Sequence, residues 1–199
     1  PKLILCHYSI KGADICAKLN IPIVQMIHSV YMWFTGDQLK EFQEAAEYTN
    51  IFICPSEYVK NYSVNRLGIP ENKCYVLPSG INLNEIKKIH FEDSRKNLRL
   101  KYKISDDDFV YLSVAAISHQ KNPIGLIKAF HRILIVCPNA KLILLGPIYD
   151  KKTMEEAKRY IKQNNLQKKV IYAGSPTSAL SYYPMADAFV CSSFFEGGP

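Results

Sequence analysis

The sequence predicts an α/β protein made of two doubly wound parallel sheets, neither of them complete within these 199 residues. Short apolar runs of strand length recur along the chain, and stretches with helical spacing of apolar residues separate them. Parallel strands need a long connection, usually a helix, so this alternation favours parallel pairing. A charged, weakly apolar region at residues 84–108 splits the alternation into two sets.

The first set is expected to hold four strands and three helices. The strands are the apolar runs at residues 3–7, 21–28, 51–54 and 74–78. The helices are residues 13–19, a helix capped by Asp37 with Leu39, Phe42 and Ala46 on one face, and residues 57–67 capped by Ser56. Gly68 and Pro70 end the last helix. These elements predict one domain over residues 1–90.

The second set predicts another domain over residues 91–199. Leu98 and Leu100 suggest a short helix within the connection. The expected strands are residues 109–117, 141–146, 169–174 and 188–191. One expected helix starts at Asn122-Pro123 and carries Ile127, Phe130, Leu134 and Cys137 on one face. A second helix starts at the capping box 153–156 and runs to about residue 163. A third helix starts at residue 178 and ends near Pro184.

The composition limits the class of protein and the cellular compartment to be expected. Hydrophobic residues make up 48% of the chain, which is enough for a core, but no apolar stretch reaches the about 18 residues of a membrane-spanning helix. The six cysteines form no C-x-x-C pair and mostly lie in apolar runs, as in a reducing compartment, so a cytoplasmic location is expected and zinc or disulfides are not. The start of the chain lacks the features of a signal peptide, and an internal piece of a longer protein is expected.

The net charge of +7 fits nucleic acid, an anionic membrane surface or phosphorylated ligands. The lysines are dispersed and lack the clustered arginines and aromatics of a nucleic-acid site, so a solvated basic surface is the better interpretation. Peripheral contact with a membrane surface is the partner expected of such a surface. No G-x-G-x-x-G, G-x-x-x-x-G-K-[ST] or H-E-x-x-H motif occurs, which removes the usual support for a dinucleotide oxidoreductase, a P-loop nucleotidase or a zincin.

Polar groups gather instead at the ends of expected strands, where open α/β sheets bind ligands. The four loops concerned are 28–29, 79–80, 118–121 and 196–198. In the last of these, a carboxylate and two glycines follow a buried strand, and paired glycines let a backbone approach a phosphate closely.

Together these loops resemble the family 4 glycosyltransferases, retaining enzymes of the GT-B fold with two facing Rossmann-like domains. The phrases that carry the resemblance are residues 23–29, 54–56, 77–82, 114–122, 144–146, 173–174, 186–187 and 193–198. The resemblance implies that residues 1–90 belong to the acceptor-side domain and residues 91–199 to the donor-side domain. It also implies transfer of a hexosyl group from a UDP- or GDP-sugar to a glycan or lipid-linked acceptor, with retention and without a metal or other cofactor, as in polysaccharide biosynthesis.

The resemblance further assigns site residues. Glu196 matches the first glutamate of a paired motif, whose carboxylate binds hydroxyls of the donor sugar. Gly197 and Gly198 would direct N–H groups at the donor pyrophosphate, and Lys121 would neutralise the departing diphosphate. His28 matches a catalytic histidine that faces the transferred sugar, although a strand-end histidine satisfied by the backbone is as good an interpretation. The remaining donor-binding residues are Ser118 and Gly174.

One position departs from the family pattern. Ala116 stands where an arginine usually follows the small residue of that strand, so one guanidinium clamp on the leaving group is missing. Two alternatives therefore stay open: a nucleotide-sugar-binding protein without transferase activity, and a nucleotide-sugar epimerase of the same fold.

Overall fold

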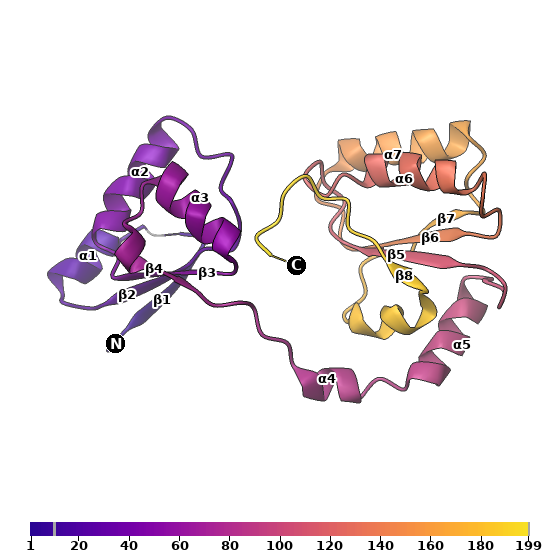
Figure 1. The fold of residues 1–199 in the computed structure, drawn as a ribbon, viewed down its shortest axis with the longest axis horizontal. Coiled ribbons are helices and arrows are strands. Elements are labelled where there is room, and N and C mark those ends of the chain that lie inside the picture. The colour runs from indigo at the N-terminus through magenta and orange to yellow at the C-terminus, as the bar shows by residue number, and fades with distance from the viewer. Residues whose placement is uncertain (10, 199) are drawn as a thin grey trace. The chain divides into compact units, whose positions relative to one another are not determined.

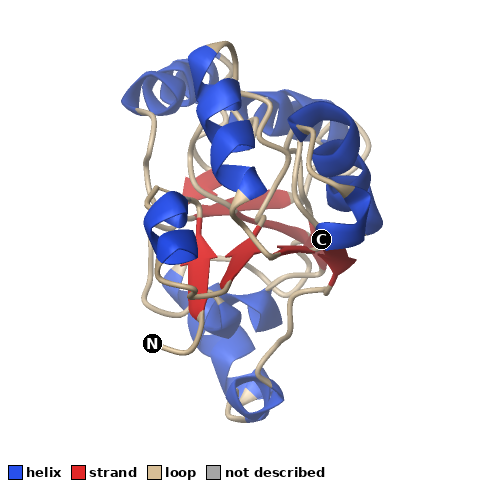
Figure 2. Cartoon of the chain, turned by 90° about the vertical axis from the view of Figure 1, so that its left-hand side faces the viewer, coloured by secondary structure: helices blue, strands red, loops and turns tan. Residues whose placement is uncertain are grey.

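A computed structural model describes residues 1–9 and 11–198 and divides the chain into two compact α/β units (Figure 1). Unit 1 is Pro1–Ile81 together with the segment that begins at Phe195, and unit 2 is Asn82–Phe194. The chain is built of helices and strands (Figure 2), and the two kinds of element alternate along most of the sequence. All the sheet pairings are parallel, so the predicted fold class is confirmed.

Unit 1 contains a four-stranded sheet in which strands adjacent in the sequence are adjacent in space, in the order β1-β2-β3-β4. The strands are β1 (Ile4–His7), β2 (Ile23–Met26), β3 (Ile51–Cys54) and β4 (Cys74–Val76). They are connected by α1 (Ala13–Lys18), α2 (Asp37–Glu47), α3 (Glu57–Leu67) and the 3₁₀ helix η1 (Glu71–Lys73). The predicted elements are present, and β2 and β4 are shorter than expected.

The helix ends of unit 1 are partly as predicted. Ser56 caps α3, because its hydroxyl accepts a hydrogen bond from the Val59 N–H at 3.3 Å. Gly68 follows α3 in the left-handed region at φ 73°, as glycine favours. The expectation that Asp37 caps α2 is wrong: Gly36 holds that position, and Asp37 is the first helical residue.

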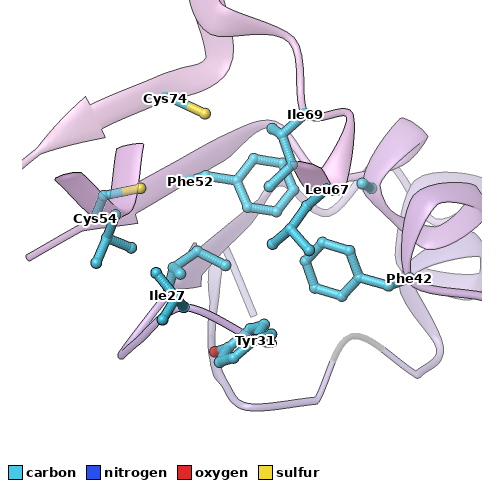
Figure 3. Packing of buried hydrophobic residues seen from close by; sticks show 11 residues of the cluster. Ile27, Tyr31, Phe42, Phe52, Cys54, Leu67, Ile69 and Cys74 are labelled. Carbon is cyan, nitrogen blue, oxygen red and sulfur yellow. The ribbon is translucent and has the colours of Figure 1, made fainter. Parts of the chain in front are cut away.

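The core of unit 1 lies between the sheet and helices α2 and α3 (Figure 3). Phe42 of α2 and Phe52 of β3 are both buried, with ring centroids 6.4 Å apart. Cys54 and Cys74 lie in the same cluster as buried free thiols, which agrees with cysteines used as small hydrophobic residues.

Unit 2 contains a four-stranded sheet in the order β7-β6-β5-β8. The strands are β5 (Val110–Val114), β6 (Lys141–Leu145), β7 (Val170–Tyr172) and β8 (Ala188–Phe189). The helices are α4 (Leu83–Lys87), α5 (Phe91–Lys101), α6 (Pro123–Ile133), α7 (Lys151–Gln163) and the 3₁₀ helix η2 (Leu180–Met185). Helices α6 and α7 cover one face of this sheet, whereas α5 and η2 cover the other (Figure 1), so a hydrophobic cluster lies on each face.

Three expectations about the helices and boundaries of unit 2 need correction. The connection at 84–108 holds two helices, α4 and α5, rather than one short helix. The capping box at Thr153 is wrong, because Asp150 caps α7 by accepting a hydrogen bond from the Lys152 N–H at 2.9 Å. The chain divides between Ile81 and Asn82 rather than after residue 90; the acceptor-side and donor-side roles of the units stay predictions.

Candidate functional site

The order of strands in unit 2 places two predicted site loops next to each other. β5 pairs with β6 on one side and with β8 on the other, in the registers Val110↔Lys141 and Tyr111↔Ala188. From β5 the chain therefore winds outward in one direction through β6 and β7, and then returns to the opposite side in β8. The carboxyl ends of the two strands flanking such a reversal are where open α/β sheets bind ligands.

Hydrogen bonds connect the loops that follow β5 and β8. The Ser192 hydroxyl donates to the backbone carbonyl of Lys121 at 2.8 Å, and the Phe194 N–H donates to the carbonyl of Gln120 at 2.9 Å. The rings of His119 and Phe194 also lie 5.3 Å apart. The structure thus brings the predicted loop 118–121 against the stretch that leads to Glu196.

The position of Lys121 is set by the turn that begins α6. The Lys121 N–H donates to the Ser118 carbonyl at 3.2 Å, and the next residue, Asn122, adopts a left-handed conformation at φ 50°. The Asn122 side chain caps α6 by accepting a hydrogen bond from the Gly125 N–H at 3.1 Å. Lys121 therefore precedes a capped helix start, where backbone N–H groups and the helix dipole favour an anion.

The loops after β6 and β7 are connected to the loop after β5 through Gly146. Gly146 has φ 144°, and a Cβ atom there would lie 2.2 Å from the Ala115 carbonyl oxygen, so only glycine fits. The Gly146 N–H donates to the Gly174 carbonyl at 2.8 Å. Gly174 has φ 84°, and the space that a Cβ atom would occupy there is open. Ala116 and Gly174, both singled out in the sequence, thus lie on either side of Gly146.

In unit 1, His28 lies two residues after the end of β2 and contacts two residues at the end of β1. Its Nε2 atom lies 2.8 Å from His7 Nδ1, a hydrogen bond between two imidazoles. The ring of Tyr8 stacks on the His28 ring with centroids 4.4 Å apart and an angle of 20°. Burial lowers the pKa of His28, and the neighbouring His7 lowers it further, so the neutral imidazole is favoured near pH 7.

The segment after Phe194 contacts His28 through Gly197. A Cβ atom on Gly197 would lie 1.9 Å from the His28 carbonyl oxygen, so this contact requires glycine. The Ser56 hydroxyl donates to the Gly197 carbonyl at 2.7 Å, and Gly198 lies near Pro55. The absence of a side chain at Gly197 therefore serves a backbone contact within unit 1. The predicted roles of both glycines toward a pyrophosphate stay predictions.

Ser29, beside His28, carries a buried hydroxyl oxygen without a hydrogen-bond partner among the described residues. A buried hydroxyl left unpaired is costly, and a ligand that pairs with it would remove that cost.

Near Tyr8, a cavity of about 650 Å³ opens between the residues before α1 and one face of α2. Its walls include Tyr8, Phe34, Gln38 and Glu41.

The predicted site residues thus fall into two groups. His28, Glu196, Gly197 and Gly198 belong to unit 1, whereas Ser118, Lys121 and Gly174 belong to unit 2. The sequence does not indicate His7 or Ser56 as neighbours of the site, although Ser56 lies in the stretch 54–56 that carries part of the family resemblance.

Within residues 1–9 and 11–198, no three His, Cys, Asp or Glu side chains gather into a possible metal site. In the same residues, no helix is long and apolar enough to span a bilayer.

Two family models match, and together they cover most of the chain. Residues 94–199 match the model of glycosyl transferases group 1, and residues 1–85 match the model of glycosyltransferase family 4. The first match covers more than half of the chain. The match to glycosyltransferase family 4 ends within α4, and the match to glycosyl transferases group 1 begins within α5.

Curated relatives include α-monoglucosyldiacylglycerol synthase of Streptococcus pneumoniae, 30% identical over 93% of this chain and 44% of that protein. An uncharacterized glycosyltransferase of Methanocaldococcus jannaschii is 23% identical over 100% of this chain and 52% of that protein. Lipopolysaccharide 1,2-N-acetylglucosaminetransferase of Salmonella typhimurium is 28% identical over 72% of this chain and 38% of that protein. The chain spans about half the length of the curated relatives it matches.

Among solved structures, HepE of Anabaena in complex with UDP and glucose superposes with a TM-score of 0.84. The sequence identity is 18%, and the match covers 96% of this chain and 52% of HepE. A structure of the same protein with UDP-glucose gives a TM-score of 0.83 at 19% identity, covering 96% of this chain and 53% of that one. At this identity the likeness establishes the fold alone.

Proposed function

This chain belongs to the glycosyl transferases of group 1, and on that basis we propose that the protein transfers a hexosyl group from a UDP- or GDP-sugar to a hydroxyl group of an acceptor. The bond between the anomeric carbon and the diphosphate oxygen breaks, and the diphosphate leaves with the electron pair. The acceptor oxygen bonds to the same face of the anomeric carbon, and its proton passes to the departing phosphate. The product keeps the anomeric configuration of the donor.

The observation that supports this proposal best is the contact between the loops after β5 and β8. It holds Lys121 ahead of a capped helix start, a combination of one cation and several N–H donors that suits a diphosphate. In the proposal Lys121 neutralises the charge that grows on the leaving group, while Ser118 and Gly174 line the donor site. Glu196 binds hydroxyls of the sugar, since a carboxylate accepts two directional hydrogen bonds. Gly197 and Gly198 bring backbone N–H groups to the pyrophosphate.

His28 acts on the transferred sugar in this proposal. A neutral imidazole can hydrogen-bond a sugar hydroxyl without adding positive charge beside an anomeric carbon that itself becomes positive. The direction of its pKa supports the neutral form near pH 7.

The acceptor is proposed to be a glycan or a lipid-linked saccharide. The cavity beside Tyr8 supports a sugar-bearing acceptor, because aromatic rings provide stacking surfaces and side chains such as Gln38 and Glu41 bind hydroxyls. The names of two relatives, α-monoglucosyldiacylglycerol synthase and lipopolysaccharide 1,2-N-acetylglucosaminetransferase, agree with such an acceptor. Peripheral contact with a membrane surface belongs to the same proposal.

A second candidate is a nucleotide-sugar-binding protein without transferase activity, favoured by Ala116. Without a guanidinium at this position, the leaving group would be stabilised less and transfer slowed, while ground-state binding through Lys121 could persist. An epimerase is the third candidate, and it would convert its sugar without any acceptor.

The test is transfer by the full-length protein from radiolabelled UDP- and GDP-hexoses, with the product's anomeric configuration read by NMR. Glu196→Gln and Lys121→Met should each lower kcat/KM by about 100-fold or more, as expected when one preorganised electrostatic contact is removed. Glu92→Gln and Lys96→Met change exposed residues of α5 and should leave the rate unchanged.

Near-normal rates for both site variants would remove Glu196 and Lys121 from the site. Nucleotide binding without transfer to any acceptor would favour the binding protein, and conversion of the sugar without acceptor would favour the epimerase. An inverted product would contradict the proposed stereochemistry.

A further inference from the structure

We infer that His7 is the positioning residue for His28: its imidazole fixes both the orientation and the tautomer with which His28 meets the sugar. This inference rests on the proposed function, because it concerns the working form of His28. The juxtaposition that carries it is the hydrogen bond of 2.8 Å between His7 Nδ1 and His28 Nε2.

The sheet explains why these two side chains meet. β1 and β2 run parallel in the register His7↔Met26, so His7 ends one strand and His28 lies just past the end of its neighbour. The carboxyl ends of parallel neighbours lie at one edge of a sheet. His7 is exposed and His28 is half-buried, so the partner of His28 is supplied from the solvent side of the site.

Tyr8 fixes the His28 ring from another side. It follows β1 with a left-handed backbone at φ 63°, which is uncommon for a residue other than glycine and indicates that its surroundings hold it there. Its ring stacks on His28 at 4.4 Å. The His28 backbone N–H also points to the Tyr31 hydroxyl at 3.4 Å. The stack restricts the plane of the ring, and the bond to His7 selects which of the two χ2 orientations that share this plane the ring adopts.

The bond also decides which ring nitrogen of His28 carries hydrogen. A neutral imidazole has one N–H donor and one lone-pair acceptor. If His7 donates, His28 Nε2 accepts and Nδ1 carries the hydrogen toward a ligand; if His28 donates, its Nδ1 presents a lone pair. In either case the tautomer of His28 is set by that of His7, because only one of the two bonded nitrogens can carry the hydrogen. Among residues 1–9 and 11–198 no hydrogen bond reaches His28 Nδ1, so this nitrogen remains for the substrate.

The pair also affects how His28 responds to pH. The titratable groups against His28 are His7, Tyr8 and Tyr31. A proton on His7 repels one on His28, so His7 helps to keep His28 neutral as the pH falls; burial acts in the same direction. Removing the His7 imidazole takes away this repulsion. The protonated fraction of His28 at a given acidic pH should then increase.

The variants His7→Ala and His7→Asn test the inference in the full-length protein. Alanine removes the hydrogen bond, whereas the amide of asparagine can place a donor or acceptor near the position of Nδ1 without titrating. We expect His7→Ala to lower kcat/KM by about tenfold, the lower end of the range known for removing a partner that orients a metal-ligating histidine. His7→Asn should recover most of this loss. In both variants the acid limb of the kcat/KM profile should move to higher pH. His7→Ala combined with His28→Ala should be no slower than His28→Ala alone.

A second measurement does not depend on catalysis. Long-range ¹H–¹⁵N NMR of protein labelled at histidine should give one dominant His28 tautomer in the parent and a mixture in His7→Ala. An unchanged tautomer and an unchanged acid limb in His7→Ala would overturn the inference, whatever the rate. If the parent transfers no sugar, the proposed function fails, but the NMR comparison still decides whether His7 controls His28.

Discussion

Arg99 is buried in unit 2, only 3% exposed, and its guanidinium donates several hydrogen bonds. It donates to the backbone carbonyls of Ser105 and Asp108, both at 2.6 Å, and lies 3.4 Å from the Asp187 carboxylate. Asp187 also accepts hydrogen bonds from Arg95 at 2.9 Å and from the Val110 N–H at 2.8 Å. Helix α5 is thereby held to the residues that begin β5 and β8.

Replacing Asp187 with asparagine should destabilise unit 2 by about 2 to 3 kcal/mol, because two guanidinium groups, one of them buried, lose their counter-charge. An amide oxygen can still accept from the Val110 N–H, so the effect isolates the charge. Urea denaturation, followed by far-UV circular dichroism, measures the change in unfolding free energy. Asp107→Asn alters an exposed residue of the nearby turn and should stay within about 0.5 kcal/mol of the parent.

The ion pairs of Asp187 with Arg95 and Arg99 also predict how the stability of unit 2 depends on pH. Burial raises the pKa of Asp187, but the Val110 N–H bond and the two arginines outweigh it, so the pKa lies below the ordinary value for aspartate. A lowered pKa means that the stabilisation is complete above the unfolded-state pKa, about 3.9, and is lost as the pH falls through the folded-state value. The stability gap between the parent and Asp187→Asn should therefore be constant from pH 7 to about pH 5 and shrink in stronger acid. A gap that grows on acidification would contradict this assignment.

Gly146 allows a direct prediction about backbone contact. In Gly146→Ala the new methyl group would meet the Ala115 carbonyl at 2.2 Å while the backbone holds φ 144°. We expect a loss of at least about 2 kcal/mol in unfolding free energy, since both the contact and the conformation oppose a side chain. Gly80→Ala is the matched control, because open space surrounds Gly80 and its φ lies outside the left-handed range. Equal stability of the two variants would show that the loop after β5 moves freely away from Gly146.

At the scale of elements, the start of α6 connects fold and site, since Lys121 directly precedes its cap. Asn122→Ala should cost about 1 to 2 kcal/mol, because the cap is lost and alanine opposes φ 50°. Asn122→Gly loses the same side chain but accepts the conformation, so it should cost only a few tenths of a kcal/mol. Thermal denaturation of the three proteins gives the comparison. A glycine variant as unstable as the alanine variant would show that the amide itself carries the effect.

Much of the fold was predictable because its strands are short apolar runs and its helices alternate with them. Helix α5 was underestimated because its interior face carries a buried arginine, Arg99, where a hydrophobic residue would have completed the periodic pattern. The start of α7 was misplaced because Asp150 and Thr153 are both good capping residues, and only the structure tells which one accepts from the helix.

The site was predictable where residues follow one another along a strand end, as in the loop 118–121. His7 was missed because its role comes from a contact with His28, 21 positions along the chain, which no local pattern encodes. Gly197 is predicted to approach a phosphate, yet in the structure the atom that a side chain at this position would meet is the His28 carbonyl oxygen, a contact that depends on how unit 1 folds. Spacing along the sequence identifies a loop; the neighbours of that loop depend on tertiary structure.

For the whole molecule, the net charge is very unevenly divided. Residues 82–194 carry 18 Lys and Arg against 10 Asp and Glu, whereas residues 1–81 carry seven of each. The positive excess therefore belongs to unit 2, the unit that contains Lys121 and its capped helix start. Such an excess attracts anionic ligands and anionic surfaces alike, and both attractions weaken as salt screens them.

If the protein contacts membranes peripherally, unit 2 should supply the attraction. We expect the full-length protein to sediment with vesicles containing phosphatidylglycerol at about 0.05 M salt and to be released near 0.5 M, because the screening length falls to a few ångströms. Glu substitutions at Lys151, Lys152 and Lys162, all exposed on α7, should weaken sedimentation at low salt.

The same substitutions at Lys2, Lys18 and Lys40 change the net charge equally but lie in unit 1, and they should have little effect. Because both triple variants lower the net charge by the same amount, a difference between them reports where the charge lies rather than how much there is. Equal losses would mean that only net charge matters, and sedimentation that persists in high salt or with neutral phosphatidylcholine vesicles would mean that apolar contacts, not lysines, hold the protein to the bilayer.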